Sequence, residues 1–305
     1  MSFAQEVKQE IIARKIARPC CVLAASYGIA CFSKYFDEHG VVLQTESQGT
    51  AQYAKRVFGM TGVLGEITEK ARPSGCIYEF AIKEPQQVKA MLEGFGHTGR
   101  EANLRINPGV LVCSGCVSAF TAAAFLCCGT ITDPSKEYHL EFMSPRYNLS
   151  RDFEALLAEH EFRPHRTKRK GTNIVYLKAS EPMEDLLTFM GASGAALEMM
   201  SRKVYKEIRN KTNRLNNCET ANLDKTVTAN VQTIKAIRYL EENGGLEALP
   251  GPLREAASKR MENSDLSLAL LAQQFSPPLS KSGLSHRFKK IEQLAQRLQE
   301  RKKNV

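Results

Sequence analysis

The sequence predicts an α+β protein: a pseudo-symmetric, duplicated α/β domain followed by an all-α helix-turn-helix domain. Two observations support this. Landmarks in residues 1–200 recur about 97 positions apart, and the charge of the chain is uneven. Residues 1–200 carry 22 basic and 22 acidic side chains, whereas residues 201–305 carry 20 basic and 11 acidic ones, so the whole net charge of +9 lies in the last third. A chain of 305 residues is long enough for two domains. The predicted divisions are a first domain at 1–200, a linker at 201–221 and a second domain at 222–305.

The first domain is predicted to contain two repeats, at about 20–95 and 114–192. Each begins with an uncharged run of small and apolar residues, at 20–33 and 116–129, which is typical of a helix buried on all sides. A strand pair, a helix, a second strand pair and a last helix follow in both, the last helices starting near Glu84-Pro85 and Glu181-Pro182. Small side chains allow two helix backbones to approach closely. The halves are therefore expected to join through their first helices and to carry two four-stranded sheets.

The opening residues predict an amphipathic helix rather than a secretory signal. Ser2 and Gln5 have the spacing of a capping box, and Phe3, Val7 and Ile11 form one apolar stripe. Residues 112–132 contain no charge, but glycines and small polar residues make the run only weakly apolar, which favours a buried helix over a membrane span. The sequence thus predicts a cytoplasmic protein with no membrane association.

Nine cysteines are present, including the vicinal pair Cys20-Cys21 and the C-x-x-C pair Cys113 and Cys116. No second ligand pair follows at a spacing typical of zinc sites, so free, buried cysteines in a reducing compartment are the favoured interpretation. The glycines of residues 94–99 match G-x-G-x-x-G, but they follow a helical pattern and precede an extended one, so they are expected to cap a helix. The sequence predicts no metal, no cofactor and no small-molecule ligand.

The last third predicts helices separated by short connections. One helix is expected from about residue 195, followed by a polar interdomain connection at 213–222 and a new helix at about 225–243. Further helices are expected at about 252–262 and 267–275, and the last begins after Ser280 as its N-cap. This final helix has one apolar stripe, predicted to face the core, because five apolar residues recur at helical spacing: Leu284, Phe288, Ile291, Ala295 and Leu298.

The first turns of this final helix have the composition of a DNA recognition helix, with short polar and cationic side chains suited to base edges and phosphates. The predicted DNA-binding residues are Lys281, Ser282, Ser285, His286, Arg287, Lys289 and Lys290. A solvent-exposed basic helix in an ordinary bundle would show the same pattern. The basic turns of the two repeats offer further phosphate contacts, with solvated surface charge as an equal alternative: Lys70, Arg72, Lys168, Arg169 and Lys170.

The duplicated architecture is similar to the LAGLIDADG homing endonuclease fold. In active members of that family each central helix ends in an acidic residue, and the two carboxylates hold divalent metal ions. Ser33 and Cys128 occupy those positions here, and Lys34 replaces the glycine that follows the first acid. Neither Ser33 nor Cys128 offers a hard carboxylate oxygen. The resemblance therefore implies a retained fold, no catalytic residues and no enzyme activity. In the alternative case, a nuclease with a relocated metal site, Asp133 or Glu141 would supply the acid.

The whole chain resembles the WhiA family. The resemblance is carried by SFAQEVKQEI, Cys20-Cys21, AAAFLCCGTITDPSKEYHLEF, NRLNNCETANLDKT, LPGPLREAASKRMENSDLSLALLAQ and LSKSGLSHRFKKIEQLA. It implies a degenerate LAGLIDADG domain joined to a helix-turn-helix, a nucleoid-associated transcriptional regulator of double-stranded DNA, and roles in cell division, chromosome segregation and sporulation. Transcription or cell-division proteins are the implied protein partners. The alternatives are a protein-interaction scaffold localised by DNA, or a nuclease with a relocated metal site.

Overall fold

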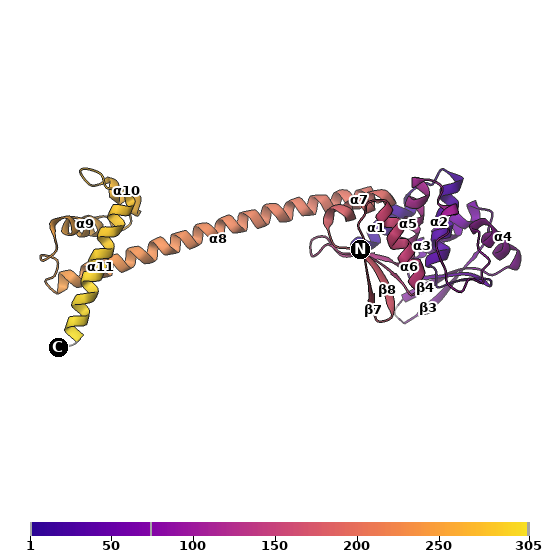
Figure 1. Ribbon diagram of the computed structural model, residues 1–305, viewed down its shortest axis with the longest axis horizontal. Coiled ribbons are helices and arrows are strands. Elements are labelled where there is room, and N and C mark those ends of the chain that lie inside the picture. The colour runs from indigo at the N-terminus through magenta and orange to yellow at the C-terminus, as the bar shows by residue number, and fades with distance from the viewer. Residues whose placement is uncertain (1, 74, 304–305) are drawn as a thin grey trace. The chain divides into compact units, whose positions relative to one another are not determined.

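The computed structural model describes residues 2–73 and 75–303. The chain divides into two compact units, residues 1–207 and 208–305. The first unit contains every strand of the described residues, and the second is helical. Figure 1 shows these elements along the chain, with the sheets of the first unit on one side of its helices.

The first unit consists of two repeats with the same order of elements, preceded by α1 (Phe3–Ala13) and joined by a short 3-10 helix at Pro108–Val110. The first repeat contains α2 (Pro19–Phe32), β1 (Tyr35–Asp37), β2 (Gly40–Thr45), α3 (Gln48–Met60), β3 (Glu66–Arg72), β4 (Gly75–Ile82) and α4 (Pro85–Phe95). The second contains α5 (Ser114–Cys128), β5 (Gly129–Ile131), β6 (Leu140–Ser144), α6 (Tyr147–Glu159), β7 (His165–Arg169), β8 (Thr172–Leu177) and α7 (Ser180–Met190). The predicted duplication is confirmed.

The two sheets have the same antiparallel topology, with strand orders β1-β2-β4-β3 and β5-β6-β8-β7. The registers place the β3–β4 hairpin tip at Arg72 opposite Gly75 and the β7–β8 tip at Arg169 opposite Thr172. The basic turns identified in the sequence therefore lie at the ends of matching hairpins, each made by an edge strand and its neighbour.

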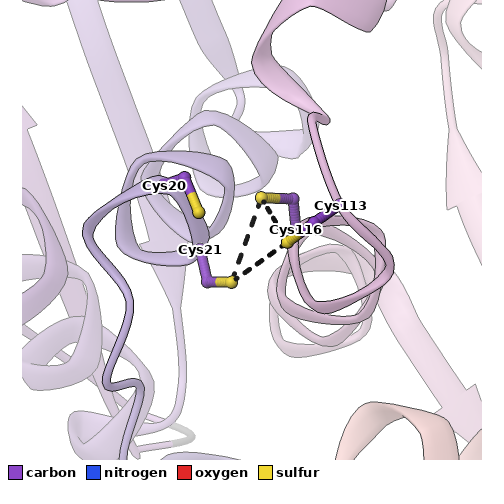
Figure 2. Close-up of side chains that lie close together, drawn as sticks. All are labelled: Cys20, Cys21, Cys113 and Cys116. Atoms are coloured by element: carbon purple, nitrogen blue, oxygen red, sulfur yellow. Dashed lines mark hydrogen bonds between the residues drawn. The ribbon is translucent and has the colours of Figure 1, made fainter.

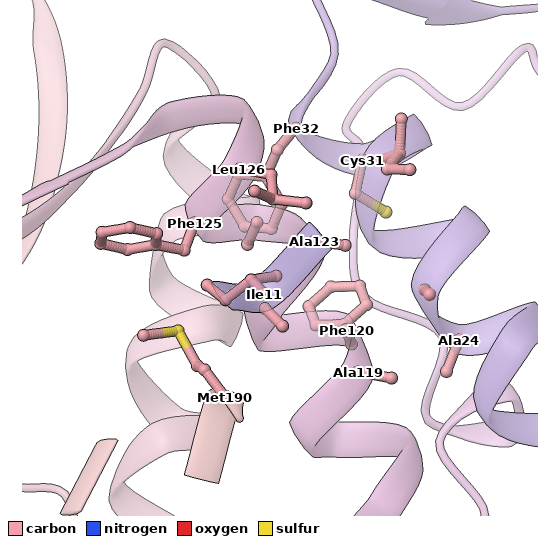
Figure 3. Close-up of a cluster of buried hydrophobic side chains, with 14 of the residues drawn as sticks. Ile11, Ala24, Cys31, Phe32, Ala119, Phe120, Ala123, Phe125, Leu126 and Met190 are labelled. Carbon is pink, nitrogen blue, oxygen red and sulfur yellow. The ribbon is translucent and has the colours of Figure 1, made fainter. Parts of the chain in front are cut away.

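Helices α2 and α5 form the centre of the first unit. Most of their side chains are buried, and the two helices pack closely against each other at Gly28. A Cβ atom there would lie 2.7 Å from the carbonyl oxygen of Phe120 and 2.9 Å from the Cβ of Ala123. Figure 3 shows the surrounding cluster, in which Phe32, Phe120 and Phe125 lie among alanines of both helices. Small residues at the crossing let the two backbones pack directly against each other.

The local features predicted for the first unit are largely confirmed. Ser2 and Gln5 form a capping box, and Phe3, Val7 and Ile11 are buried. Gly96 ends α4 in the left-handed conformation with φ of 66°, as expected of a glycine that caps a helix. Pro85 is the first residue of α4, whereas α7 begins at Ser180, so that Pro182 lies inside its first turn. Among the described residues no helix is long and apolar enough to cross a membrane.

The prediction of two helices separated by a polar connection at 213–222 is wrong. The structure has one helix, α8, from Ser193 to Glu242. The chain contains neither glycine nor proline between Gly194 and Gly244, so nothing in its backbone chemistry ends the helix. Asparagine and threonine have only slightly lower helix propensity, and polarity alone does not interrupt a helix whose side chains are exposed.

The second unit packs α9 (Gly251–Glu262), α10 (Leu268–Gln273) and α11 (Lys281–Lys303) around the last part of α8. The Oγ of Ser280 accepts a hydrogen bond from the backbone N–H of Gly283 at 3.0 Å, which confirms the predicted N-cap of α11. The predicted stripe is also confirmed: Leu284, Phe288, Ile291 and Ala295 are buried and Leu298 is partly buried against them. This stripe fixes which side of α11 faces solvent.

Candidate nucleic-acid interface

The N-terminal half of α11 presents an exposed cationic and polar surface. Of the seven residues predicted to contact DNA, Lys281, Ser282, His286, Lys289 and Lys290 are exposed and Ser285 and Arg287 are half-buried. With 3.6 residues per turn, the buried stripe leaves the side centred on Ser282, His286 and Lys289 pointing away from the core. We call six of these residues the α11 face: Lys281, Ser282, Ser285, His286, Lys289 and Lys290. They form one continuous surface.

The start of α11 also suits a phosphate group. Ser280 satisfies the N–H of Gly283, and the first helical residues, Lys281 to Leu284, include no acid. The first N–H groups of a helix carry partial positive charge, which favours an anion at this end. Ser282 and Ser285 have short side chains, so they allow a close approach of this turn to a partner.

Arg287 differs from the other predicted DNA contacts. Its Nη1 donates a hydrogen bond to the carbonyl oxygen of Pro252 at 3.2 Å and lies 4.0 Å from a carboxylate oxygen of Glu255. The guanidinium also lies 5.6 Å from the ring centroid of Phe275. These partners hold α11 against the start of α9, so the structure gives Arg287 a role inside the unit.

A groove of about 470 Å³ runs beside the α11 face. Lys281, Ser285 and Lys289 line it from α11, and Lys225 is among the residues that line it from α8. At its base, Thr233 donates a hydrogen bond to the carboxylate of Glu292 at 2.6 Å, which joins the two helices. Lys225 could not be identified from the sequence, because its place beside α11 depends on the packing of α8 against that helix.

A buried arginine supports the connection between α9 and α10 and contacts the core side of α11. The Arg260 guanidinium donates hydrogen bonds to the carbonyl oxygens of Leu266 at 2.7 Å and Asn263 at 3.3 Å, and it lies 5.3 Å from the Phe288 ring centroid. Burial lowers the pKa of Arg260. Arg260 could not be identified from the sequence, because nothing in the spacing of α9 distinguishes it from Arg254 and Lys259, which are less buried.

The hairpin tips of the first unit are less uniform than the sequence implied. Arg72, Lys168, Arg169 and Lys170 are exposed, but Lys70 Nζ lies 3.0 Å from a carboxylate oxygen of Glu79 on the neighbouring strand. Hydrogen bonds from Gln44 and then Lys70 lower the pKa of Glu79. Lys70 is therefore already paired with an acid, whereas the other four have no ion-pair partner within residues 2–73 and 75–303.

The ends of the central helices lack the chemistry of a nuclease metal site. Ser33 is buried, and its Oγ donates to the carbonyl oxygen of Ile29 at 2.6 Å. Cys128 donates its thiol to the carbonyl oxygen of Ala124, and burial raises its pKa to about 12. A cavity of about 680 Å³ beside Cys128 is lined by Lys8, with Glu46 as its one lining carboxylate among the described residues. One carboxylate beside a lysine is a poor ligand set for a hard divalent cation, which prefers several oxygen ligands.

An arginine occupies the end of α2. Arg146 Nη1 donates to the carbonyl oxygens of Cys31 at 2.8 Å and Ser33 at 2.9 Å, and Nη2 donates to that of Lys34 at 3.3 Å. These carbonyls have no partner within the helix, and a cation is favourable at a helix C-terminus. Arg146 comes from the N-cap of α6 in the second repeat, so it also joins the two repeats.

Replacing Arg146 by methionine is expected to lower the free energy of unfolding by about 2 kcal/mol, since hydrogen bonds from a charged donor contribute about 1.5–3 kcal/mol. Urea denaturation of the full chain measures this change. Arg151→Met, on the exposed side of the same helix, is the matched control and should alter stability by less than about 0.5 kcal/mol. Equal stability of the two variants would contradict the capping role of Arg146.

The acids offered for a relocated metal site have other partners. Asp133 accepts a hydrogen bond from Arg202 Nη1 at 2.6 Å, and hydrogen bonds, first of all from Ser135, lower its pKa. Glu141 lies 3.0 Å from His139 Nε2. Within residues 2–73 and 75–303, the structure gathers three or more possible metal ligands at one place only, and that place contains cysteines instead of carboxylates.

The cysteine cluster differs from what the spacing of Cys113 and Cys116 predicts. No second ligand pair follows Cys113 and Cys116 in the sequence, but the fold places Cys20 and Cys21 beside them (Figure 2). The four sulfur atoms all lie within 4.8 Å of one another. A hydrogen bond from Cys116 lowers the pKa of Cys113 to about 6, whereas burial raises that of Cys116 to about 12. The missing pair lies earlier in the chain, where a search for following ligands could not find it.

The fold and the site together define a class of protein: a duplicated LAGLIDADG-type domain joined to a helix-turn-helix domain. The models of two families match the chain, the WhiA LAGLIDADG-like domain over residues 117–209 and the WhiA C-terminal HTH domain over residues 212–295. The chain belongs to the WhiA family. It is similar over 99% of both lengths, with 39% identity, to the "Probable cell division protein WhiA" of Thermoanaerobacter pseudethanolicus. It is 33% identical to that of Clostridium botulinum over 98% of this chain and 99% of the relative.

Solved structures show the same fold. The crystal structure of full-length DUF199/WhiA from Thermotoga maritima matches 97% of this chain and 99% of its own, with a TM-score of 0.62 and 20% identity. The N-terminal LAGLIDADG domain of DUF199/WhiA matches 62% of this chain and 92% of its own, with a TM-score of 0.50 and 16% identity. These matches agree with the α+β class and the order of the two folds predicted from the sequence.

Proposed function

We propose that this chain is a transcriptional regulator that binds double-stranded DNA with the α11 face. The observation that carries the proposal is the exposed set of lysines, serines and a histidine on the first turns of a helix in a helix-turn-helix domain. Such a helix inserts its N-terminal turns into the major groove. The net charge of +9 in residues 201–305 favours association with a polyanion.

Each residue of the α11 face has a role in this proposal. Lys281, Ser282, Ser285 and His286, on the first two turns, contact base edges or nearby phosphates. Lys289 and Lys290 lie one turn further along and fix the helix on the DNA backbone. Arg287 acts indirectly, by holding α11 on α9. The exposed hairpin residues Arg72 and Lys168 to Lys170 supply secondary phosphate contacts.

The proposed biological role is in cell division, chromosome segregation and, in spore formers, sporulation. The curated relatives are named as probable cell division proteins, which supports the first of these roles. Transcription or cell-division proteins are the proposed protein partners, and DNA binding would place the chain with the nucleoid. In this proposal residues 201–221, within α8, connect the first domain at 1–200 to the main DNA-binding domain at 222–305.

The first domain is proposed to have no nuclease activity. We expect the full chain to leave supercoiled plasmid DNA intact in the presence of Mg²⁺ or Mn²⁺, because the helix ends carry Ser33 and Cys128 in place of acids, with Arg146 bound at the first and Lys8 lining the cavity beside the second. Agarose electrophoresis over a time course measures this. Metal-dependent cleavage that disappears in Asp133→Asn or Glu141→Gln would instead establish a relocated metal site.

Fluorescence anisotropy of labelled duplex DNA with the full chain, repeated over a series of salt concentrations, tests the proposal. The logarithm of the association constant should fall linearly with the logarithm of the salt concentration, since cationic side chains displace counterions from phosphates. Six to ten phosphate contacts would reduce affinity by about 10³- to 10⁵-fold between 50 and 200 mM salt. No measurable binding at low salt would refute the proposal.

A further inference from the structure

The four-cysteine cluster formed by Cys20, Cys21, Cys113 and Cys116 has the dimensions of a mononuclear metal site. The Sγ of Cys21 lies 3.8 Å from that of Cys113 and 3.9 Å from that of Cys116, and the last two are 3.3 Å apart. A tetrahedral zinc ion with Zn–S bonds of about 2.3 Å separates its sulfur ligands by about 3.8 Å. The observed distances fit this geometry with small shifts.

The cluster also has the chemistry of a thiophilic site. It offers four sulfur ligands and no oxygen, a set that selects zinc and other soft ions over magnesium or calcium. Cys21 and Cys116 are buried, and Cys20 and Cys113 are half-buried, so solvent has limited access. All nine cysteines of the chain are free thiols in the structure, which leaves each of these four able to bind a metal.

The helix N-termini at which these cysteines lie favour thiolate, and they act against the burial that raises the pKa of Cys21 and Cys116. Cys20 and Cys21 lie in the first turn of α2, and Cys113 is the N-cap of α5, with Cys116 in its first turn (Figure 2). Two helix N-termini thus converge on the four sulfurs, and the partial positive charge of each stabilises thiolate. Arg14, Lys15 and Arg18 line a cavity together with Cys21, so cationic side chains also lie close by. A tetrathiolate zinc complex has a charge of −2, which these groups offset.

The packing at the cluster is closed around the sulfurs. Gly115 lies between the members of the C-x-x-C pair, and a Cβ atom there would lie 3.0 Å from the Sγ of Cys21 and 3.6 Å from that of Cys113. A side chain at this position would push the two cysteine pairs apart. The glycine thus permits the approach that a shared metal requires.

We propose that this four-cysteine cluster binds one Zn²⁺ ion through four thiolates and that the ion joins the two repeats of the first unit. Cys21 and Cys113 are 92 residues apart in the chain and belong to different repeats. The metal would tie the starts of α2 and α5 together, while Arg146 joins the repeats at the end of α2. Because the site has four protein ligands and no open position, its role is structural.

Metal analysis of the full chain tests the proposal. The protein is purified with a thiol reductant, without chelators and without a metal-binding tag, and its zinc content is measured by inductively coupled plasma mass spectrometry. We expect one zinc ion per chain. Replacement of zinc by Co²⁺ should give the visible d–d absorption of a tetrahedral tetrathiolate complex and the near-ultraviolet charge-transfer absorption of cobalt–thiolate bonds. Neither zinc nor a cobalt spectrum in the reduced protein would overturn the proposal.

Variants locate the metal. Cys20→Ser and Cys113→Ser change half-buried ligands, and both should lose most of the zinc while circular dichroism remains that of a folded protein. Cys76→Ser and Cys218→Ser, at exposed cysteines outside the cluster, are the matched controls and should retain it. A chelator should lower the melting temperature of the parent and the controls but leave that of the cluster variants unchanged. Full zinc content in Cys20→Ser and Cys113→Ser, iron in place of zinc, or a Cys113–Cys116 disulfide in protein kept reduced would each overturn the assignment.

Discussion

Replacing Lys281 and Lys289 together by alanine is expected to weaken the binding of the full chain to duplex DNA by about 100-fold. Both side chains are exposed on the α11 face and line the same groove. Each hydrogen bond to a charged group contributes about 1.5 kcal/mol or more, and two such losses correspond to about two orders of magnitude in affinity. Anisotropy measurements at several salt concentrations should also show a slope reduced by about two, because two phosphate contacts are gone.

A matched control separates this effect from a general loss of charge. Lys235 and Arg238 are exposed on α8 in the same unit, away from the start of α11, and Lys235→Ala/Arg238→Ala removes the same charge. The control should retain affinity within about threefold, because long-range electrostatics are screened at physiological salt. Arg287 is left intact in both proteins because its contacts with α9 make its loss a change in stability as well. Equal weakening by the two double variants would show that charge, and not the α11 face, governs binding.

Replacing Gly28 by valine is expected to lower the free energy of unfolding of the first unit by about 3 kcal/mol. The added side chain would begin at a Cβ 2.7 Å from the Phe120 carbonyl oxygen, a backbone atom that cannot rotate away. The central helices must therefore separate, and the contacts around Phe120 in Figure 3 are lost with them. Urea denaturation followed by circular dichroism measures the change.

Gly59 provides the control for this prediction. It lies in α3, and no atom lies within 4 Å of the position that an added Cβ would take. Gly59→Ala should therefore raise the free energy of unfolding by about 0.5–1 kcal/mol through helix propensity alone. A Gly28→Val protein as stable as the parent would mean that the central helices do not pack as closely as the structure shows.

The duplicated fold could be predicted because its signals are local and occur twice. Uncharged helices at 20–33 and 116–129, each followed by the same series of strands and helices, need no knowledge of long-range contacts. The apolar stripe from Leu284 to Ala295 is similarly local, and it fixed the exposed side of α11 correctly. Periodicity determines which side of a helix is buried, and therefore also which side remains for a partner.

What could not be predicted depends on contacts between distant residues. The guanidinium of Arg146 reaches carbonyls about 113 positions away, and no motif marks it. The four-cysteine cluster had one usable signal: the repeat aligns Cys20 with Cys116, and both lie at the starts of helices expected to pack together. The polar stretch at 213–222 differs in its cause: its composition is typical of a connection, but it contains no glycine or proline to end the helix, so α8 continues through it.

Photo-cross-linking of the full chain to duplex DNA, with mass spectrometry of the linked peptides, tests most directly whether α11 is the DNA-binding element. We predict cross-links within residues 281–290, with weaker ones at the β3–β4 and β7–β8 hairpin tips. Loss of the α11 cross-links in Lys281→Ala/Lys289→Ala, but not in Lys235→Ala/Arg238→Ala, should accompany the loss of affinity. Cross-links confined to the hairpins, with none on α11, would contradict the assignment and make the duplicated domain the DNA-binding part of the chain.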